Sequence, residues 1–108
     1  MSTNGEAYHL EFTEEYAKEA DKIFNYISKE LHAKESAKQL LRRIEDETKK
    51  LRRMPKIYPE AQKYDGTKRA YRKFIIDNYV VLYTIDESKK TVYIAHIFYS
   101  GSNYIDKI

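Results

Sequence analysis

The chain has 108 residues, of which 34% are charged and 42% hydrophobic, and it contains no cysteine. This length corresponds to one domain, residues 1–108, with a single modest core. The lack of cysteine excludes a disulfide scaffold and thiol catalysis. The first residues lack the basic and apolar regions of a signal peptide, and no apolar run approaches the roughly 20 residues that span a bilayer. We therefore expect a soluble, cytoplasmic domain with no membrane partner.

The net charge of +3 is unevenly distributed along the chain. Residues 1–37 carry 4 Lys or Arg and 8 Asp or Glu, a net charge of −4. Residues 38–73 carry 13 and 5, a net charge of +8, and residues 74–108 carry 3 and 4, a net charge of −1. The basic middle third indicates a polyanion or an acidic partner. A second helix with a solvated Lys/Arg face is the simpler alternative.

The first half of the chain predicts a strand and two helices. Ala7 to Phe12 favours a short opening strand. Thr13 then offers an N-cap for an amphipathic helix, which the apolar spacing extends to Leu31. A second helix begins at Ser36, or at Lys34-Glu35 just before it, and Pro55 stops it. Because so few residues join the two helices, they should form an antiparallel hairpin.

The second half of the chain predicts three strands after an irregular loop, residues 55–67, to which we assign no element. The strands run from about Lys68 to Ile76, from Tyr79 to Asp86 and from Thr91 to Tyr99. Asp77-Asn78 is expected to form a two-residue hairpin turn. The order β-α-α-β-β-β predicts a two-layer α+β domain, in which a helical hairpin packs on a small, mainly antiparallel sheet.

The last two strands are apolar on both faces, where a half-solvated sheet would show polar residues at every second position. Because a helical hairpin covers one face only, we expect the other to be an exposed apolar, tyrosine-rich binding surface. The tail Ser100 to Ile108 is not expected to cover it, since Gly101, Ser102 and Asn103 offer little to pack. Along the strand from Tyr79 to Asp86, the side chains expected on one face are Tyr79, Val81, Tyr83 and Ile85, and those on the other are Val80, Leu82, Thr84 and Asp86. Along the strand from Thr91 to Tyr99, one face is expected to carry Val92, Ile94, His96 and Phe98, and the other Tyr93, Ala95, Ile97 and Tyr99.

Metal and cofactor chemistry find little support in the sequence. His9, His32 and His96 are isolated, and no His/Asp/Glu group has the spacing of metal ligands. His96 is expected to be a satisfied core or interface histidine. The few glycines form no phosphate-binding loop, and a serine triad lacks its nucleophile elbow. We therefore expect neither a metal nor a cofactor.

RNA cleavage through the 2′-hydroxyl needs no metal, but it needs cations, an acid and a base. Arg69, Arg72 and Lys73 could supply charge, since arginine grips phosphate bidentately. Tyr99 or Tyr104 could stack on a base or donate a proton, and Glu60 is a conceivable base. A simpler interpretation is that the basic residues keep an edge strand from aggregating and that the tyrosines are ordinary strand residues.

Several segments together resemble the RelE/ParE superfamily of toxins. The similarity covers nearly the whole chain in the right order, although no single motif is diagnostic. The resemblance implies the β-α-α-β-β-β fold and a place in a type II toxin–antitoxin system, where a cognate antitoxin neutralises the toxin. The segments that carry it are Tyr16…Ala20…Ile23…Tyr26-Ile27, Ala37…Leu40-Leu41…Ile44…Leu51…Pro55, Tyr71-Arg72…Asn78 to Tyr83, and Val92 to Ile94 with Ile97 to Tyr99.

The resemblance leaves two mechanisms open. RelE-type members cut mRNA at the ribosome, whereas ParE-type members inhibit DNA gyrase. RelE-type enzymes often carry Tyr-Arg-x-Leu-Tyr in the third strand, where this chain has Val80 in place of the arginine. Basic residues are also expected after Tyr99, where Ser100-Gly101-Ser102 stands. The sequence therefore favours the gyrase-inhibiting ParE branch, with a RelE-like nuclease as the alternative and a non-toxic interaction module as a second one.

The candidate sites follow from these alternatives. If the chain is a nuclease, the candidate catalytic residues are Arg72, Lys73 and Tyr99. In every case we expect an acidic or amphipathic antitoxin segment to lie near residues 68–73 and Tyr99. The candidate residues for binding the target or the antitoxin are Lys68, Arg69, Arg72, Lys73, Tyr99 and Tyr104.

Overall fold

The computed structural model describes residues 7–64, 66 and 69–108. Strand β2 (His9–Phe12) leads into helix α1 (Glu14–Asn25), and Thr13 caps the helix as predicted. The backbone N–H of Tyr16 donates to Thr13 Oγ1 over 3.1 Å, which satisfies one of the free amides of the first turn. Glu14 and Glu15 place negative charge at the positive end of the helix dipole.

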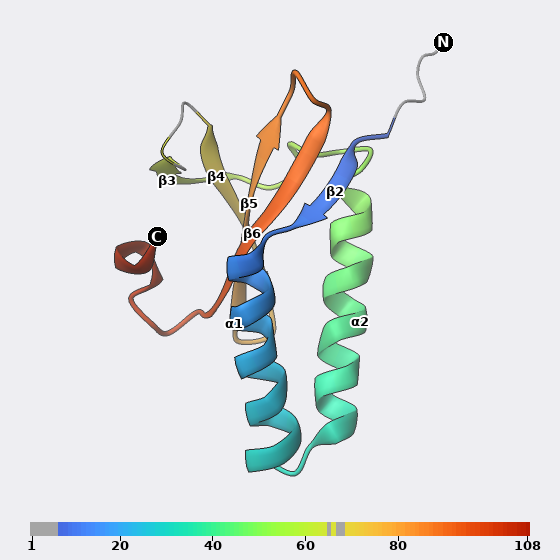
Figure 1. The fold of residues 1–108 in the computed structure, drawn as a ribbon, viewed down its shortest axis with the longest axis vertical. Coiled ribbons are helices and arrows are strands. Elements are labelled where there is room, and N and C mark those ends of the chain that lie inside the picture. Colours follow the sequence, from blue (N-terminus) through green and yellow to red (C-terminus); the bar gives the residue numbers. More distant parts are fainter. Residues whose placement is uncertain (1–6, 65, 67–68) are drawn as a thin grey trace.

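The two helices form the predicted antiparallel hairpin, but the first is not one continuous α-helix (Figure 1). After Asn25 the chain makes a π-helical turn, Tyr26–Glu30, in which the N–H of Leu31 donates to the carbonyl of Tyr26 over 3.1 Å. Helix α2 spans Lys34–Lys50, so the earlier of the two predicted starts is confirmed. It ends five residues before Pro55.

Five strands form one mixed sheet in the order β2-β6-β5-β4-β3. Strand β2 pairs parallel with β6, and all other neighbours are antiparallel. The predicted bounds of β5 (Tyr79–Asp86) and β6 (Thr91–Tyr99) are confirmed, and β4 runs from Ala70 to Ile76. Its predicted start at Lys68 lies outside the described residues. Asp77, with a φ of 53°, makes the left-handed turn between β4 and β5.

The loop expected over residues 55–67 is a wrong prediction, because it contains a strand, β3 (Glu60–Tyr64). Glu60 pairs with Arg72 and Tyr64 with Ala70, so β3 forms one edge of the sheet. Edge strands tolerate polar and charged residues. The segment Glu-Ala-Gln-Lys-Tyr therefore has no apolar alternation from which a strand could be read.

A bulge in β6 overturns the predicted assignment of its faces. Tyr83 pairs with Ile94 and Leu82 with His96, so Ala95 is an extra residue on the β6 side. Beyond the bulge the alternation shifts by one residue. Ile97 therefore lies in the helix-facing core, and Phe98 lies in the cluster on the other face.

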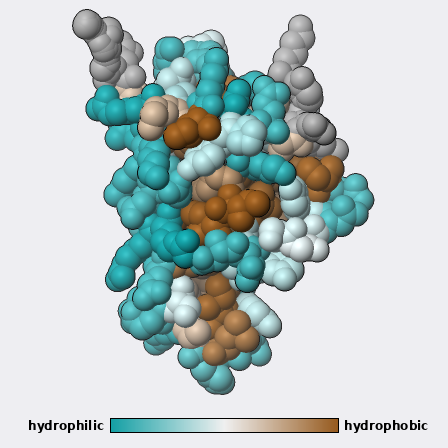
Figure 2. All heavy atoms as spheres, turned by 180° about the vertical axis from the view of Figure 1, so that it is seen from behind, coloured by the Kyte–Doolittle hydropathy of each residue, from teal (hydrophilic) through white to brown (hydrophobic). Residues whose placement is uncertain are grey.

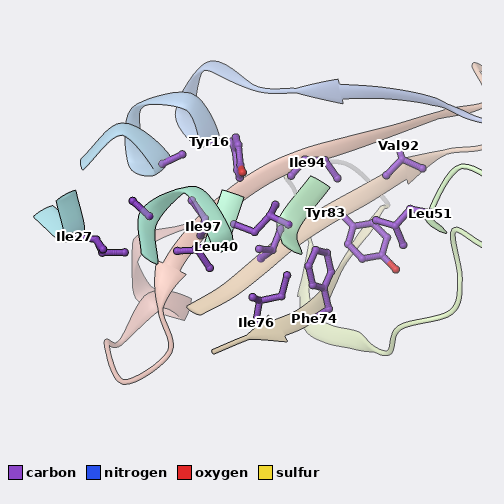
Figure 3. Close-up of a cluster of buried hydrophobic side chains, with 14 residues drawn as sticks. Tyr16, Ile27, Leu40, Leu51, Phe74, Ile76, Tyr83, Val92, Ile94 and Ile97 are labelled. Carbon is purple, nitrogen blue, oxygen red and sulfur yellow. The ribbon is translucent and has the colours of Figure 1, made fainter. Parts of the chain in front are cut away.

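The main core lies between the helical hairpin and the sheet (Figure 3). The two helices contribute apolar residues at three- and four-residue steps, and the strands contribute the side chains that face the helices. Its buried residues are Tyr16, Ala20, Ile27, Ala37, Leu40, Ile44, Leu51, Phe74, Ile76, Val81, Tyr83, Val92, Ile94 and Ile97.

The second sheet face is not the open apolar surface that the sequence predicted, because the C-terminal tail folds back over part of it. A 3₁₀ turn, Tyr104–Lys107, brings the ring of Tyr104 parallel to that of Phe98, with centroids 6.2 Å apart. Tyr104 and Ile108 pack against five buried residues, Tyr71, Val80, Leu82, Ala95 and Phe98. Glycine at position 101 suits this reversal of the chain, because a Cβ atom there would lie 2.5 Å from the Tyr99 ring and the ring would have to shift.

The helical hairpin reaches beyond the end of the sheet and makes the molecule elongated, with extents of 48 × 30 × 21 Å (Figure 1). Figure 2 shows hydrophobic atoms gathered at this end of the surface. Tyr26 and Leu31, both 55% exposed, belong to the tip of the hairpin. No helix in the described part of the chain is long and apolar enough to cross a membrane.

Candidate functional site

The basic residues at the start of β4 are held by acidic and carbonyl oxygens. Arg69 Nη1 lies 2.9 Å from Asp86 Oδ2, and its guanidinium lies 5.6 Å from the centre of the Tyr93 ring. Hydrogen bonds from Ser88 and from the Lys89 backbone, and to a smaller extent the charge of Arg69, keep the pKa of the Asp86 carboxyl below its usual value. Lys68, the fourth basic residue of this group, lies outside the described residues.

Arg72 is a bridge between β4 and the segment that precedes β3. Its Nη1 donates to the carbonyl oxygen of Tyr58 over 2.7 Å, and its Nη2 lies 3.5 Å from Glu60 Oε2. Only 18% of its side chain is exposed. The guanidinium therefore already supports the fold, and its expected partner in catalysis, Glu60, neutralises it.

The fold brings two of the candidate residues, Lys73 and Tyr104, into contact on the second sheet face. Lys73 Nζ lies 3.4 Å from the hydroxyl of Tyr104, which the C-terminal tail carries onto the second sheet face. Because side chains alternate along a strand, Lys73 and Arg72 project from opposite faces of the sheet. Lys73 therefore shares its face with Tyr104 and not with Arg72.

Tyr99 lies at the other end of the sheet from Arg72. Arg72 pairs with Tyr83 and Tyr99 pairs with Tyr79, so four residues of β5, about 13 Å, separate the two levels. Tyr99 is 56% exposed, and its ring meets that of Tyr79 edge-on at 6.3 Å. Burial, with the neighbouring Tyr26 and Tyr99, raises the pKa of Tyr79. Tyr26, Tyr79 and Tyr99 thus form a tyrosine cluster at the end of the sheet where β5 begins and β6 ends.

His96 is satisfied within the fold, as predicted. Its Nδ1 lies 3.0 Å from Glu19 Oε2, and the N–H of Ile97 donates to Glu19 Oε1 over 3.1 Å. The imidazole stacks on Phe98 with ring centres 5.3 Å apart. Within the described ranges, no group of three or more His, Cys, Asp or Glu residues could hold a metal ion.

A cleft of about 320 Å³ on the second sheet face is the site feature that sequence reasoning missed. The bulge at Ala95 turns His96 onto the same face as Tyr93, and both residues line the cleft. The Thr84 side chain, 3% exposed, also lines it. Reading β6 as a regular strand put Tyr93 and His96 on opposite faces, so the sequence pattern carried no sign of this cleft.

Residues 10–104 match a family model described as the ParE toxin of the type II toxin–antitoxin system parDE. The chain belongs to this ParE toxin family. The match takes in β2 from Leu10, both helices, strands β3 to β6 and the first residue of the C-terminal turn. It therefore covers each candidate residue from Lys68 to Tyr104.

Two solved structures have the same fold as this ParE-family chain. One is the chromosomal ParDE toxin–antitoxin system from P. aeruginosa, with a TM-score of 0.66 at 17% sequence identity, over 86% of this chain and 96% of the other. The other is the archaeal RelE–RelB complex from Pyrococcus horikoshii OT3, with a TM-score of 0.57 at 13% identity, over 88% and 97%. Among curated proteins, no sequence matches the chain significantly.

Proposed function

We propose that this ParE-family chain is the toxic half of a type II toxin–antitoxin pair, which arrests growth by binding DNA gyrase and is neutralised by a cognate antitoxin. Membership of the family supports the toxin half of this proposal. The proposed mechanism rests on the positions of this chain's own residues. The proposal of an antitoxin partner rests on the net charge of the middle third of the chain and on the structures that share its fold.

The observation that carries a binding mechanism is the separation of the candidate catalytic groups. Cleavage without metal requires a cation, an acid and a base within hydrogen-bond reach of one phosphate. Arg72 and Lys73 project from opposite sheet faces, and Tyr99 lies about 13 Å along the sheet from the level of Arg72. Val80, at the position of the RelE-type arginine, is 1% exposed within the second apolar cluster.

The tyrosine cluster offers a surface for binding a protein target. Tyr26 and Tyr99 are each more than half exposed, and Leu31 continues the apolar surface along the hairpin tip. Tyrosine is enriched among the residues that dominate protein interfaces, because it has a large apolar area, few rotatable bonds and a hydroxyl. We therefore assign target binding to this end of the molecule.

Two observations support an antitoxin partner. The middle third of the chain has a net charge of +8, which suits an acidic segment. The two structural relatives are described as a ParDE toxin–antitoxin system and as a RelE–RelB complex. Masking by an antitoxin would also explain exposed apolar residues on so small a domain.

One observation favours the alternative, a RelE-like nuclease that cuts mRNA at the ribosome. Lys73 Nζ lies 3.4 Å from the hydroxyl of Tyr104, and such a pair could position a proton donor beside a cation. Arg72, the other candidate catalytic cation, projects from the opposite face of the sheet, so binding is the function that the site supports better.

The deciding experiment adds the purified chain to a DNA gyrase supercoiling assay and maps mRNA 5′ ends after its induction in cells. We expect inhibited supercoiling and broken DNA, with no new codon-positioned ends. Tyr99→Asp should weaken inhibition at least about tenfold, whereas Tyr99→Phe should preserve it. Codon-positioned ends that vanish in Lys73→Ala would establish the nuclease alternative, and the absence of both effects would leave a non-toxic interaction module.

A further inference from the structure

A groove lies outside the surfaces described so far, where the segment after α2 meets the turn between β5 and β6. Its cavity volume is about 620 Å³. Segment 53–57 forms most of it, with Tyr8 and Glu87 completing the lining. We call it the loop groove. Among the described residues it is a larger hollow than the cleft on the second sheet face.

The floor of the loop groove is apolar and exposed to solvent. Met54 and Ile57 are 51% and 47% exposed, although both are large hydrophobic residues three positions apart in one short segment. Tyr8, which is half-buried, and Pro55, which is buried, complete the apolar lining. Burial of apolar area stabilises a complex, so two half-exposed apolar neighbours favour a bound partner.

The groove is already built in the free chain. The buried hydroxyl of Tyr83 donates to the carbonyl oxygen of Pro55 over 2.8 Å, and the N–H of Ile57 donates to the carbonyl of Met54 over 3.2 Å. On the other wall, Tyr8 exchanges two hydrogen bonds with Arg52, since its N–H donates to the Arg52 carbonyl and its carbonyl accepts from Arg52 Nε. A partner therefore pays little ordering entropy here.

The rim of the groove is basic. Lys56 Nζ lies 3.3 Å and Lys90 Nζ 3.9 Å from the Glu87 carboxylate, which also accepts a hydrogen bond from the Tyr8 hydroxyl. The hydrogen bond from Tyr8, followed by Lys56, lowers the pKa of Glu87. The exposed guanidinium of Arg53 has no hydrogen-bond or ion-pair partner among the described residues. Two cations thus share one carboxylate, and a third stands free.

We propose that the loop groove binds an acidic segment of the antitoxin, which lays a large apolar side chain on Met54 and Ile57 and a carboxylate on Arg53. This inference rests on the proposed function, because it assigns the antitoxin a contact surface at residues 53–57, in addition to the one expected near residues 68–73 and Tyr99. The apolar floor distinguishes the site from one for nucleic acid, where phosphate contacts dominate. A two-fold contact with a second copy would set this basic rim against its own equivalent, which like-charge repulsion disfavours.

The test measures the affinity of the antitoxin encoded with this chain for purified toxin variants by calorimetry. Arg53→Glu and Met54→Glu change exposed side chains, so the fold should survive. Lys18→Glu is the matched control, because it reverses an exposed positive charge on α1, outside the groove. We expect affinity to fall at least about tenfold in each groove variant and to change less than about twofold in the control.

Hydrogen exchange on the wild-type complex provides a second readout that needs no variant. The backbone amides of residues 53, 54 and 56–58 should gain protection when the antitoxin binds. Unchanged affinity of both groove variants, or no gain of protection at these amides, would overturn the inference while the antitoxin still suppressed growth arrest. Failure of the proposed function is distinct, because the wild-type chain would then neither arrest growth nor inhibit gyrase, whatever the affinities.

Discussion

The buried hydroxyl of Tyr83 donates a hydrogen bond of 2.8 Å to the carbonyl oxygen of Pro55. This contact joins the central strand β5 to the segment after α2, 28 residues away in the sequence. The Tyr83 side chain is fully buried, and burial raises its pKa to about 12. The Tyr83 side chain therefore packs in the core between the helices and the sheet and also holds Pro55, which lines the loop groove.

Tyr83→Phe should destabilise the chain by about 1–2 kcal/mol, because the ring still fills the core but the Pro55 carbonyl loses its donor. Urea unfolding would give the change in the free energy of unfolding. Tyr93→Phe is the control, since the Tyr93 hydroxyl has no hydrogen-bond partner in the part of the chain that the structure describes, and it should cost less than about 0.5 kcal/mol. Equal effects from the two substitutions would show that the Tyr83 bond contributes nothing.

Alkaline pH should destabilise the fold, because three tyrosines, Tyr83 among them, have raised pKa values in the folded chain. Burial raises the pKa of Tyr16, Tyr58 and Tyr83 to about 12 in the folded chain, whereas an unfolded tyrosine titrates near 10. The unfolded state therefore releases its protons first as the pH rises. The stabilisation is complete below pH 10 and is lost progressively between pH 10 and 12. Urea midpoints measured from pH 8 to 12 should fall in that window, and fall less in Tyr83→Phe. A flat profile would contradict the raised pKa values.

The elements that the sequence predicted correctly are those in which the spacing of apolar residues reflects burial. The apolar spacing identified both helices, and the bounds of β5 and β6 follow from apolar runs between turn residues. Strand β3 was missed because an edge strand of charged and polar residues carries no periodicity. The bulge at Ala95 was missed because it is defined by the register against Leu82 and Tyr83, which no local pattern encodes.

The candidate site was less predictable than the fold. Arg69, Arg72 and Lys73 form one basic cluster in the sequence, yet strand geometry turns Lys73 away from Arg72, and nearby acceptors hold Arg69 and Arg72. Pairing partners such as Asp86 and Tyr58 lie 14 or more residues away, so local reasoning could not find them. The tail was misjudged because Gly101 to Asn103 pack poorly, whereas the residues after them, Tyr104 and Ile108, make the contacts.

The carboxylate of Glu19 connects α1 to β6 just after the bulge at Ala95. It accepts a hydrogen bond from the Ile97 N–H and lies 3.0 Å from His96 Nδ1. Glu19→Ala should cost about 1–3 kcal/mol, because the partly buried Ile97 amide loses its acceptor. Glu19→Gln keeps an acceptor oxygen and should cost less. Thermal unfolding would rank the variants, and hydrogen exchange at Ile97 should quicken in Glu19→Ala. A cost in Glu19→Gln as large as in Glu19→Ala would assign the effect to charge and not to the amide bond.

The C-terminal turn should behave as a cover for the second apolar cluster. The Tyr104 ring stacks on Phe98, and the tail also packs over Val80 and Leu82. Tyr104→Ala removes that ring, so we expect greater fluorescence of a hydrophobic dye and a loss of about 1–3 kcal/mol from lost burial. Tyr99→Ala is the matched control, because the same deletion at a residue that is 56% exposed uncovers little of the cluster. Dye binding that rose equally in both variants would mean that the tail does not protect the sheet face in solution.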